Sequence, residues 1–457
     1  MTTVVAPMRR PTYATLLATT AISMAGTRIS AIAVPWFVLI TTGSPAKTGL
    51  VAVCEMTPLV LAMALGGPII DRIGPRRISV RADVASTALV ALIPLLHAVR
   101  LLAFPTLLVI VALAGAARGP GDAAKSAMAP DIAEATGLSL ERVTGLEGTA
   151  QRSSQIVAPA VAGLVIAALG AANALYLDAA SFAICALGVA VCAPRRHVAE
   201  AGEHERYRAQ LHSGWRFLSG EPLLRAIAGM ICVTNLLDVA YSSVLLPVWI
   251  KDHGYGPAQL GLLGSAFGLT ATLGALAAAA FGDRLPRRAT YLVGFAVATP
   301  PRVIAMALGT PIWALVGISV VGGFGIGFIN PIIGAIFAER TPRDLIGRVS
   351  SMTGALSWAG MPLGAIGAGL AIVAVGLAPA LAVAGGLYLL ATTLPGLLPQ
   401  WRDMNRRRGA PGTRSGGAEQ RAAGCVERGS GDPTGRVRGH ERHHVRDLVD
   451  VADAAER

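Results

Sequence analysis

Long apolar segments, separated by short polar ones, make up most of this 457-residue chain. An α-helix needs roughly 20 consecutive apolar residues to cross a bilayer. Twelve segments approach or exceed that length, at 13–40, 46–70, 79–99, 101–122, 143–169, 172–193, 223–250, 258–282, 290–308, 311–337, 347–374 and 376–398. Apolar and polar residues do not alternate over any long stretch, which argues against a β-rich soluble fold. The pattern predicts an all-α integral membrane protein with twelve transmembrane helices.

The composition agrees with a membrane protein. Only 14% of the residues are charged, whereas a soluble domain carries about 25%. Mean hydropathy is +0.57, and 53% of the residues are hydrophobic. The net charge of +12 would by itself suit a nucleic-acid partner, but the placement of the charges argues against one.

Basic residues gather in every second loop. The rich loops and the start of the chain hold Arg9, Arg10, Arg72, Arg76, Arg77, Arg81, Lys125, Arg142, Arg195, Arg196, Arg206, Arg208, Arg284, Arg287, Arg288, Arg340, Arg343 and Arg348, and the intervening loops hold little beyond Lys47, Arg100 and Lys251. This asymmetry follows the positive-inside rule of membrane proteins. It predicts a multi-pass protein of the plasma (inner) membrane with both termini in the cytoplasm.

The polar segment 194–222 divides the spans into two groups of six. We therefore predict a cytoplasmic N-terminal segment (1–12), two six-helix bundles (13–193 and 223–398), a central cytoplasmic loop between them, and a cytoplasmic tail (399–457). The tail is rich in Gly, Arg and Ser and lacks an apolar face, so we expect it to be disordered. Weak internal similarity links the bundles: "IIDRIGPRR" returns as "FGDRLPRR". Two parallel copies of one six-helix unit explain this repeat.

The stretch "GGPIIDRIGPRR" (66–77), which follows the second apolar segment, carries a resemblance to a known family. It resembles the signature G-x-x-x-D-R-x-G-R-[RK] of the major facilitator superfamily, with matches at Gly67, Asp71, Arg72, Gly74 and Arg76, followed by Arg77. The second copy retains Asp283, Arg284, Arg287 and Arg288. The segments "KSAMAPDIA", "GWRFLSGEPLLR" and "NPIIGAIFAERTPRDLIGRVSS" resemble the branch that exports drugs, macrolides and siderophores. The resemblance implies a monomeric secondary transporter that works by alternating access.

We call the signature residues of both copies the cytoplasmic gate. Asp71 is expected at the cytoplasmic end of the second span, where a carboxylate can meet the positive N-terminus of a helix from the other bundle. Thr341, Pro342 and Asp344 predict such a helix start before the eleventh span. In this interpretation the gate closes the cytoplasmic side. The alternative is that these basic loops only set the membrane topology.

A second motif lies in the fifth span, where "APAVAG" (158–163) resembles the G-P-x-x-G-G motif of antiporter-type exporters. Pro159 and Gly163 match, whereas Ala158 and Ala162 replace glycines. We expect a kinked helix of small residues that packs closely where the two bundles meet. Ordinary small-residue packing is the alternative.

Charged residues inside apolar spans are costly and usually functional. Six stand out: Arg28, Glu55, Arg152, Asp178, Asp238 and Arg302. Glu55 and Asp238 are candidates to bind a proton or a cationic substrate, and Arg28 is a candidate to pair with one of them. A static ion pair is the alternative. Asp178 is expected near the outer surface, and Asp83 and Asp122 are expected to pair with Arg81 or Arg118.

The leading functional hypothesis is proton-coupled efflux of a small amphiphilic compound, such as a drug, a macrolide or a siderophore-like molecule. The predicted partners are this substrate, protons and the lipid bilayer. An importer or an uncoupled facilitator of a small metabolite is the alternative, and a non-transporting receptor or scaffold is a more distant one. No G-x-x-x-x-G-K-[ST], H-E-x-x-H or metal-spaced cysteine pattern occurs, so we predict neither an enzyme nor a cofactor or metal site.

Overall fold

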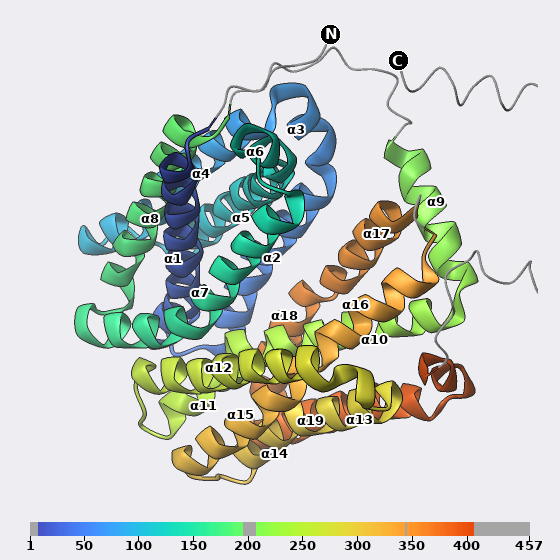
Figure 1. Ribbon diagram of the computed structural model, residues 1–457. Coiled ribbons are helices and arrows are strands. Elements are labelled where there is room, and N and C mark those ends of the chain that lie inside the picture. Colours follow the sequence, from blue (N-terminus) through green and yellow to red (C-terminus); the bar gives the residue numbers. More distant parts are fainter. Residues whose placement is uncertain (1–7, 195–206, 343–344, 406–457) are drawn as a thin grey trace, which may run out of the picture. The chain divides into compact units, whose positions relative to one another are not determined.

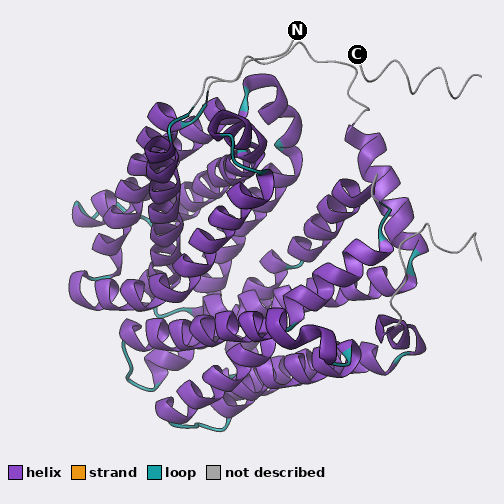
Figure 2. Cartoon of the chain, in the orientation of Figure 1, coloured by secondary structure: helices purple, strands orange, loops and turns teal. Residues whose placement is uncertain are grey.

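The computed structural model describes residues 8–194, 207–342 and 345–405. Every regular element in these ranges is a helix (Figure 2). Within these described ranges, twelve helical segments are long and apolar enough to cross a membrane, from Arg10–Thr42 to Leu377–Leu397. The predicted all-α membrane fold is therefore confirmed. The predictions for 406–457 and for Asp344 lie outside the described residues.

The first six spans use eight helices, which Figure 1 labels in chain order. They are α1 (Arg10–Thr42), α2 (Pro45–Leu65), α3 (Gly67–Ile73), α4 (Pro75–Ala98), α5 (Phe104–Ala127), α6 (Ala129–Thr136), α7 (Leu140–Leu169) and α8 (Ala171–Cys192). We call this group the N-half.

The remaining spans are more interrupted, and we call them the C-half. Its elements are α9 (Tyr207–Gly220), α10 (Pro222–Ala240), η1 (Tyr241–Leu245), α11 (Leu246–Asp252), α12 (Pro257–Phe281), η2 (Gly282–Arg284), α13 (Arg287–Ala298), α14 (Pro300–Ala307), α15 (Ile312–Gly327), α16 (Ile329–Arg340), α17 (Ile346–Ala359), α18 (Met361–Val375), α19 (Leu377–Leu397) and η4 (Pro399–Asn405).

Prolines account for two interruptions inside spans of the C-half. Pro247 has no N–H to bond the carbonyl four residues earlier, and just before it η1 forms a π-helical turn in which the amide of Leu246 bonds the carbonyl of Tyr241. Pro300, at the first position of α14, follows the break at Thr299. Both interruptions place polar side chains inside a span.

The two halves share an apolar core at one end of the spans only. We call the end where α1 begins and α19 finishes the terminal end, and the opposite end the far end. The shared core contains far-end residues of both halves, such as Phe37, Val51, Trp249 and Leu381. At the terminal end each half has its own core: Tyr13 belongs to that of the N-half and Trp401 to that of the C-half. The halves are therefore joined chiefly at the far end.

Glycines bring helices of the two halves into backbone contact. Near the far end, the start of α12 lies along the end of α7 (Figure 1), and a Cβ added to Gly261 would stand 2.4 Å from the Pro159 carbonyl oxygen. A Cβ added to Gly49 of α2 would stand 2.4 Å from the Ala365 carbonyl oxygen of α18. Such approaches are possible only without side chains. These two helix pairs form the joint between the halves.

Two sequence predictions about polar segments are corrected. The central loop contains helix α9, which was not predicted. Residues 399–405, assigned to the disordered tail, form η4, in which Trp401 is fully buried. In both cases an amphipathic or aromatic segment packs against the C-half, which composition alone does not reveal. The helix start predicted at Thr341, Pro342 and Asp344 falls partly outside the described residues, and α17 begins just after it, at Ile346.

Candidate functional site: a cavity between the halves

A cavity of about 510 Å³ lies between the N-half and the C-half. Its wall combines residues of α1, α2 and α7 with residues of α10, η1, α11, α12, α14 and α18. Most of the lining is apolar, from Ile32, Met56, Leu263 and Phe267 among others. A volume of this size suits a small organic molecule. The wall places three of the charged residues singled out in the sequence, Arg28, Glu55 and Arg302, at the same cavity.

Glu55 pairs with Arg118 of α5, and Arg28, the partner suggested for either Glu55 or Asp238, makes no ion pair within 4.0 Å among the described residues. The Arg118 Nη1 donates to Glu55 Oε1 at 3.0 Å, and the two side chains are only 15% and 17% exposed. Arg118 had been expected to pair with an aspartate. Asp83 instead accepts a bond of 2.8 Å from Lys125, and Asp122 lies 3.9 Å from the same ammonium group. The expected pairing of Asp83 and Asp122 with Arg81 or Arg118 is wrong.

Asp238 lies behind the cavity wall within a polar cluster of the C-half. Thr299 donates to Asp238 Oδ1 and Tyr388 donates to Asp238 Oδ2, both at 3.4 Å. Thr299 also accepts a bond of 3.1 Å from Arg302 Nη2. Arg302 lines the cavity, so the cluster connects the carboxylate of Asp238 to the cavity surface.

Asp178 does not line the cavity. It is 1% exposed, accepts a short hydrogen bond from Ser30 and accepts another from Ser181 at 3.2 Å. It is buried between α1 and α8, about two turns from the start of α8 at the far end. Its hydroxyl partners satisfy both oxygens, which is the arrangement of a structural carboxyl group.

A second cavity of about 250 Å³ adjoins the first toward the start of α7 and the end of α12. The two cavities share Arg28, Pro159, Gly264 and Phe267. Arg152 projects into the second cavity beside Gln155 and Asn330. Arg28 and Arg152 therefore face a continuous space between the halves.

The cytoplasmic gate is described in part. The backbone places Asp71 in α3 and Asp283 in η2, and Gly74 has a φ of 94°, a conformation that favours glycine. For Asp71 and Asp283 the structure describes the backbone but not the side chain. Arg72, Arg77 and Arg284 are exposed, and Gly67 opens α3. The structure thus locates the gate on short elements at the terminal end.

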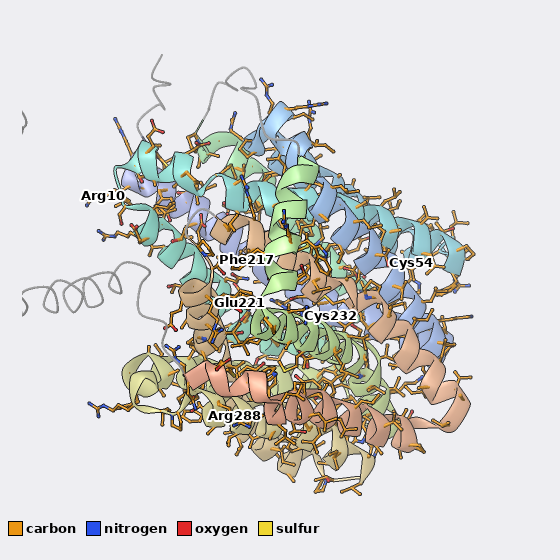
Figure 3. The ribbon with its side chains drawn as sticks, turned by 90° about the vertical axis from the view of Figure 1, so that its right-hand side faces the viewer. Arg10, Cys54, Phe217, Glu221, Cys232 and Arg288 are labelled. Atoms are coloured by element: carbon orange, nitrogen blue, oxygen red, sulfur yellow. The ribbon has the colours of Figure 1, made fainter. Side chains whose placement is uncertain are left out.

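The other gate arginines bond groups of their own half. Arg76 donates to the carbonyl oxygens of Val189 and Ala190 at the end of α8. Arg288 donates from Nε and Nη2 to the Gly396 carbonyl at 3.0 and 2.8 Å, beside α19 (Figure 3). Arg287 makes a two-pronged bond of 2.7 Å with Glu339. In each half an arginine therefore caps the last carbonyls of the sixth span.

We predict that Arg288→Gln destabilises the C-half. Losing two bonds from a charged donor to a helix end costs about 2 kcal/mol. The apparent melting temperature of the purified chain should fall by several degrees, measured by the fluorescence of its tryptophans. The exposed Arg284→Gln variant is the control and should melt like the parent. Equal melting of both variants would contradict the capping role.

The "APAVAG" motif (158–163) belongs to α7 and lies at the joint of the halves. A Cβ added to Gly163 would stand 2.7 Å from the Pro257 carbonyl oxygen, and Pro159 lies inside α7. Because Pro159 carries no N–H, the helix ladder is interrupted there. The next amide, at Ala160, donates to Ser265 Oγ of α12 at 2.9 Å.

Sequence reasoning missed several residues of the site. The sequence predicts Arg118 only as a structural partner of an aspartate, and it singles out none of Thr299, Tyr388, Ser242 and Ser243. Ser242 and Ser243 line the cavity from the π-turn η1. The available signals were prolines: Pro247 follows the serines, and Pro300 follows Thr299. No signal in the sequence pairs Tyr388 with Asp238, 150 positions away.

The sequence of the chain is similar to a family model and to membrane transporters of known name. A family model described as a transmembrane secretion effector matches residues 2–414. The multidrug efflux pump Tap of Mycobacterium tuberculosis is 33% identical over 383 residues, which cover 81% of this chain and 88% of that protein. The Tap pump of Mycolicibacterium fortuitum is 31% identical over 385 residues, with coverages of 82% and 90%. These relatives are transporters and not enzymes.

Solved structures share the fold at low sequence identity. A variant of the nucleoside transporter NupG superposes with a TM-score of 0.71 and 14% identity, covering 84% of this chain and 98% of that one. A bacterial homologue of the lysosomal transporter Spinster, in an inward-facing and unoccupied conformation, superposes with a TM-score of 0.65 and 15% identity, covering 88% and 99%.

Proposed function

Since the chain belongs to the major facilitator superfamily of membrane transporters, we propose that it exports a small amphiphilic compound across the bacterial inner membrane by alternating access. The observation that carries this proposal is the apolar cavity between two halves that are joined at the far end. With both termini in the cytoplasm, as the basic loops favour, this conformation faces inward. Rocking of the halves about the cavity would then present the substrate to the outside.

We propose protons as the driving ion. Glu55 is the carboxylate on the cavity wall. Asp238 lies behind the wall and is connected to Arg302 through the hydroxyl of Thr299. Removal of water from a carboxylate favours its protonated form, so either group is suited to take up a proton during the cycle. Protonation of Glu55 would weaken its pair with Arg118 and change the charge of the wall.

The cytoplasmic gate is the proposed closing device of the outward-facing state. Asp71 and Asp283 stand on short helices at the terminal end, where the described cores of the two halves are separate. On closure each aspartate would meet a helix N-terminus of the other half.

Efflux from intact cells tests the proposal. Cells that lack their own exporters are loaded with a panel of fluorescent amphiphiles, and efflux is followed with and without a protonophore. We expect export by the parent, its loss with the protonophore, and a loss of about tenfold or more in Glu55→Gln or Asp238→Asn, as for groups that carry charge inside a membrane. Glu141→Gln, an exposed carboxyl at the start of α7, is the control at matched expression. Efflux that survives both the protonophore and both variants would contradict proton coupling.

A further inference from the structure

We infer that the cavity binds the acidic end of its substrate, so that the exported compound is an amphiphilic anion. This inference rests on the proposed function and specifies its substrate class. It differs from one of the sequence-based alternatives, in which Glu55 or Asp238 binds a cationic substrate.

The charges that face the two cavities are predominantly positive. The charged lining residues are Arg28, Glu55 and Arg302 in the larger cavity and Arg28 and Arg152 in the smaller one. Glu55 is the single carboxylate among these lining residues, and Arg118 already neutralises it at 3.0 Å. In the part of the chain that the structure describes, Arg28 and Arg152 have no ion-pair partner within 4.0 Å. A cationic group entering this space would therefore meet like charge.

Arg302 is held in place as a binding group. It is 7% exposed, and its guanidinium lies 4.0 Å from the Phe267 ring centre and 4.9 Å from that of Tyr241. Nη2 donates to Thr299, while the buried Nε has no hydrogen-bond partner among the described residues. A buried N–H without a partner is costly. A carboxylate or phosphate matches the planar fork of an arginine and would satisfy such a donor.

Asp238 makes no direct ion pair with Arg302 at the cavity surface. Its contact with Arg302 runs through the hydroxyl of Thr299, and no Arg302–Asp238 pair within 4.0 Å is present. The carboxylate lies on the far side of the wall, whereas Arg302 lines the cavity itself. An anion that binds the guanidinium would therefore not have to displace Asp238.

The rest of the larger cavity suits the apolar part of an amphiphile. Ile32, Met56, Leu263 and Phe267 supply apolar surface, and Ser242 and Ser243 supply hydroxyl groups for orientation. A few fixed polar groups in an apolar wall are typical of small-molecule sites. The inside-negative membrane potential would also favour outward movement of an anion.

A matched pair of dyes tests the inference. Fluorescein and rhodamine 6G share the xanthene ring system but are anionic and cationic, respectively, at neutral pH. Binding of each dye to the purified full-length chain is measured by fluorescence polarisation in one uncharged detergent. We expect tighter binding of fluorescein, weakened about 10- to 100-fold in Arg302→Gln or Arg28→Gln, the range for a lost charge-assisted hydrogen bond.

Two controls make the result specific. Arg142→Gln removes an exposed arginine at the start of α7 and should leave fluorescein binding unchanged. Arg28 contacts no described polar partner, so Arg28→Gln tests the inference even if Arg302→Gln fails to fold. Tighter binding of rhodamine 6G, no binding of fluorescein, or unchanged fluorescein affinity in a folded Arg28→Gln variant would overturn the inference.

The inference and the export proposal fail in different ways. If cells export rhodamine 6G while fluorescein does not bind, export stands and the anion preference is wrong. If fluorescein binds through Arg28 and Arg302 but no dye leaves the cells, the anion site stands and export is wrong.

Discussion

Replacing Arg118 by Gln is expected to reduce transport severely and to destabilise the folded chain. The change leaves the Glu55 carboxylate without its partner at 3.0 Å in a site where both side chains are largely buried. Removing one member of a buried ion pair costs about 3–5 kcal/mol, mainly because the remaining charge is uncompensated. Transport in intact cells and the melting temperature of the purified chain are the two measurements.

The double variant Arg118→Gln with Glu55→Gln separates structure from mechanism. Since two amides leave no charge behind, the melting temperature should return toward that of the parent, giving a coupling free energy of at least about 1 kcal/mol in a double-mutant cycle. Transport should stay low, because neither residue can then respond to protons. Additive effects of the two single changes on stability would show that the pair makes no contribution.

Replacing the glycines at the contacts between the halves by alanine is expected to have the second large effect. A Cβ at Gly49 would stand 2.4 Å from the Ala365 carbonyl oxygen, and one at Gly369 would stand 2.8 Å from the Pro45 carbonyl oxygen. Because these neighbours are backbone atoms, the helices α2 and α18 must move apart, at a cost of about 1–3 kcal/mol. Gly49→Ala and Gly369→Ala should therefore open the far end and impair transport.

Gly367 provides the matched control for these variants. It lies on α18 two residues before Gly369, and an added Cβ would meet nothing within 4 Å. Gly367→Ala should keep transport, and its helix gains about 0.5–1 kcal/mol from alanine. Opening is measured as thiol labelling from outside of a Val51→Cys variant whose five native cysteines are replaced by serine. Identical labelling in Gly49→Ala and Gly367→Ala would refute the role of the contact.

The membrane spans could be predicted from the sequence because membrane insertion depends on local composition. Twelve apolar segments correspond to twelve candidate membrane spans among the described residues, and the repeated "DR" motifs marked corresponding elements, α3 and η2. The interruptions at η1 and before α14 were not predicted, although Pro247 and Pro300 mark them. A proline in an apolar run is compatible with a straight span, a kink or a break, and only packing against neighbours decides between them.

Charged residues could be found from the sequence, but their partners could not. Glu55, Arg28 and Arg302 stand out because charge is rare in apolar segments, and all three line the cavity. The distances between spans are not encoded in residue spacing. Glu55 meets Arg118, 63 positions away, and Asp238 meets Tyr388, 150 positions away. Residue spacing therefore could not decide whether Arg28 pairs with Glu55 or with Asp238, and the structure shows an ion pair with neither. Glu55, chosen as a coupling candidate, lines the cavity.

Transport by inside-out membrane vesicles tests the central claim most directly. In such vesicles the cytoplasmic face is outside, so an exporter accumulates its substrate in the lumen when respiration acidifies that lumen. The account predicts accumulation of the dye that binds the purified chain, its collapse with a protonophore, and its absence in Arg118→Gln vesicles of equal protein content. Accumulation only in right-side-out vesicles would identify an importer and contradict the account.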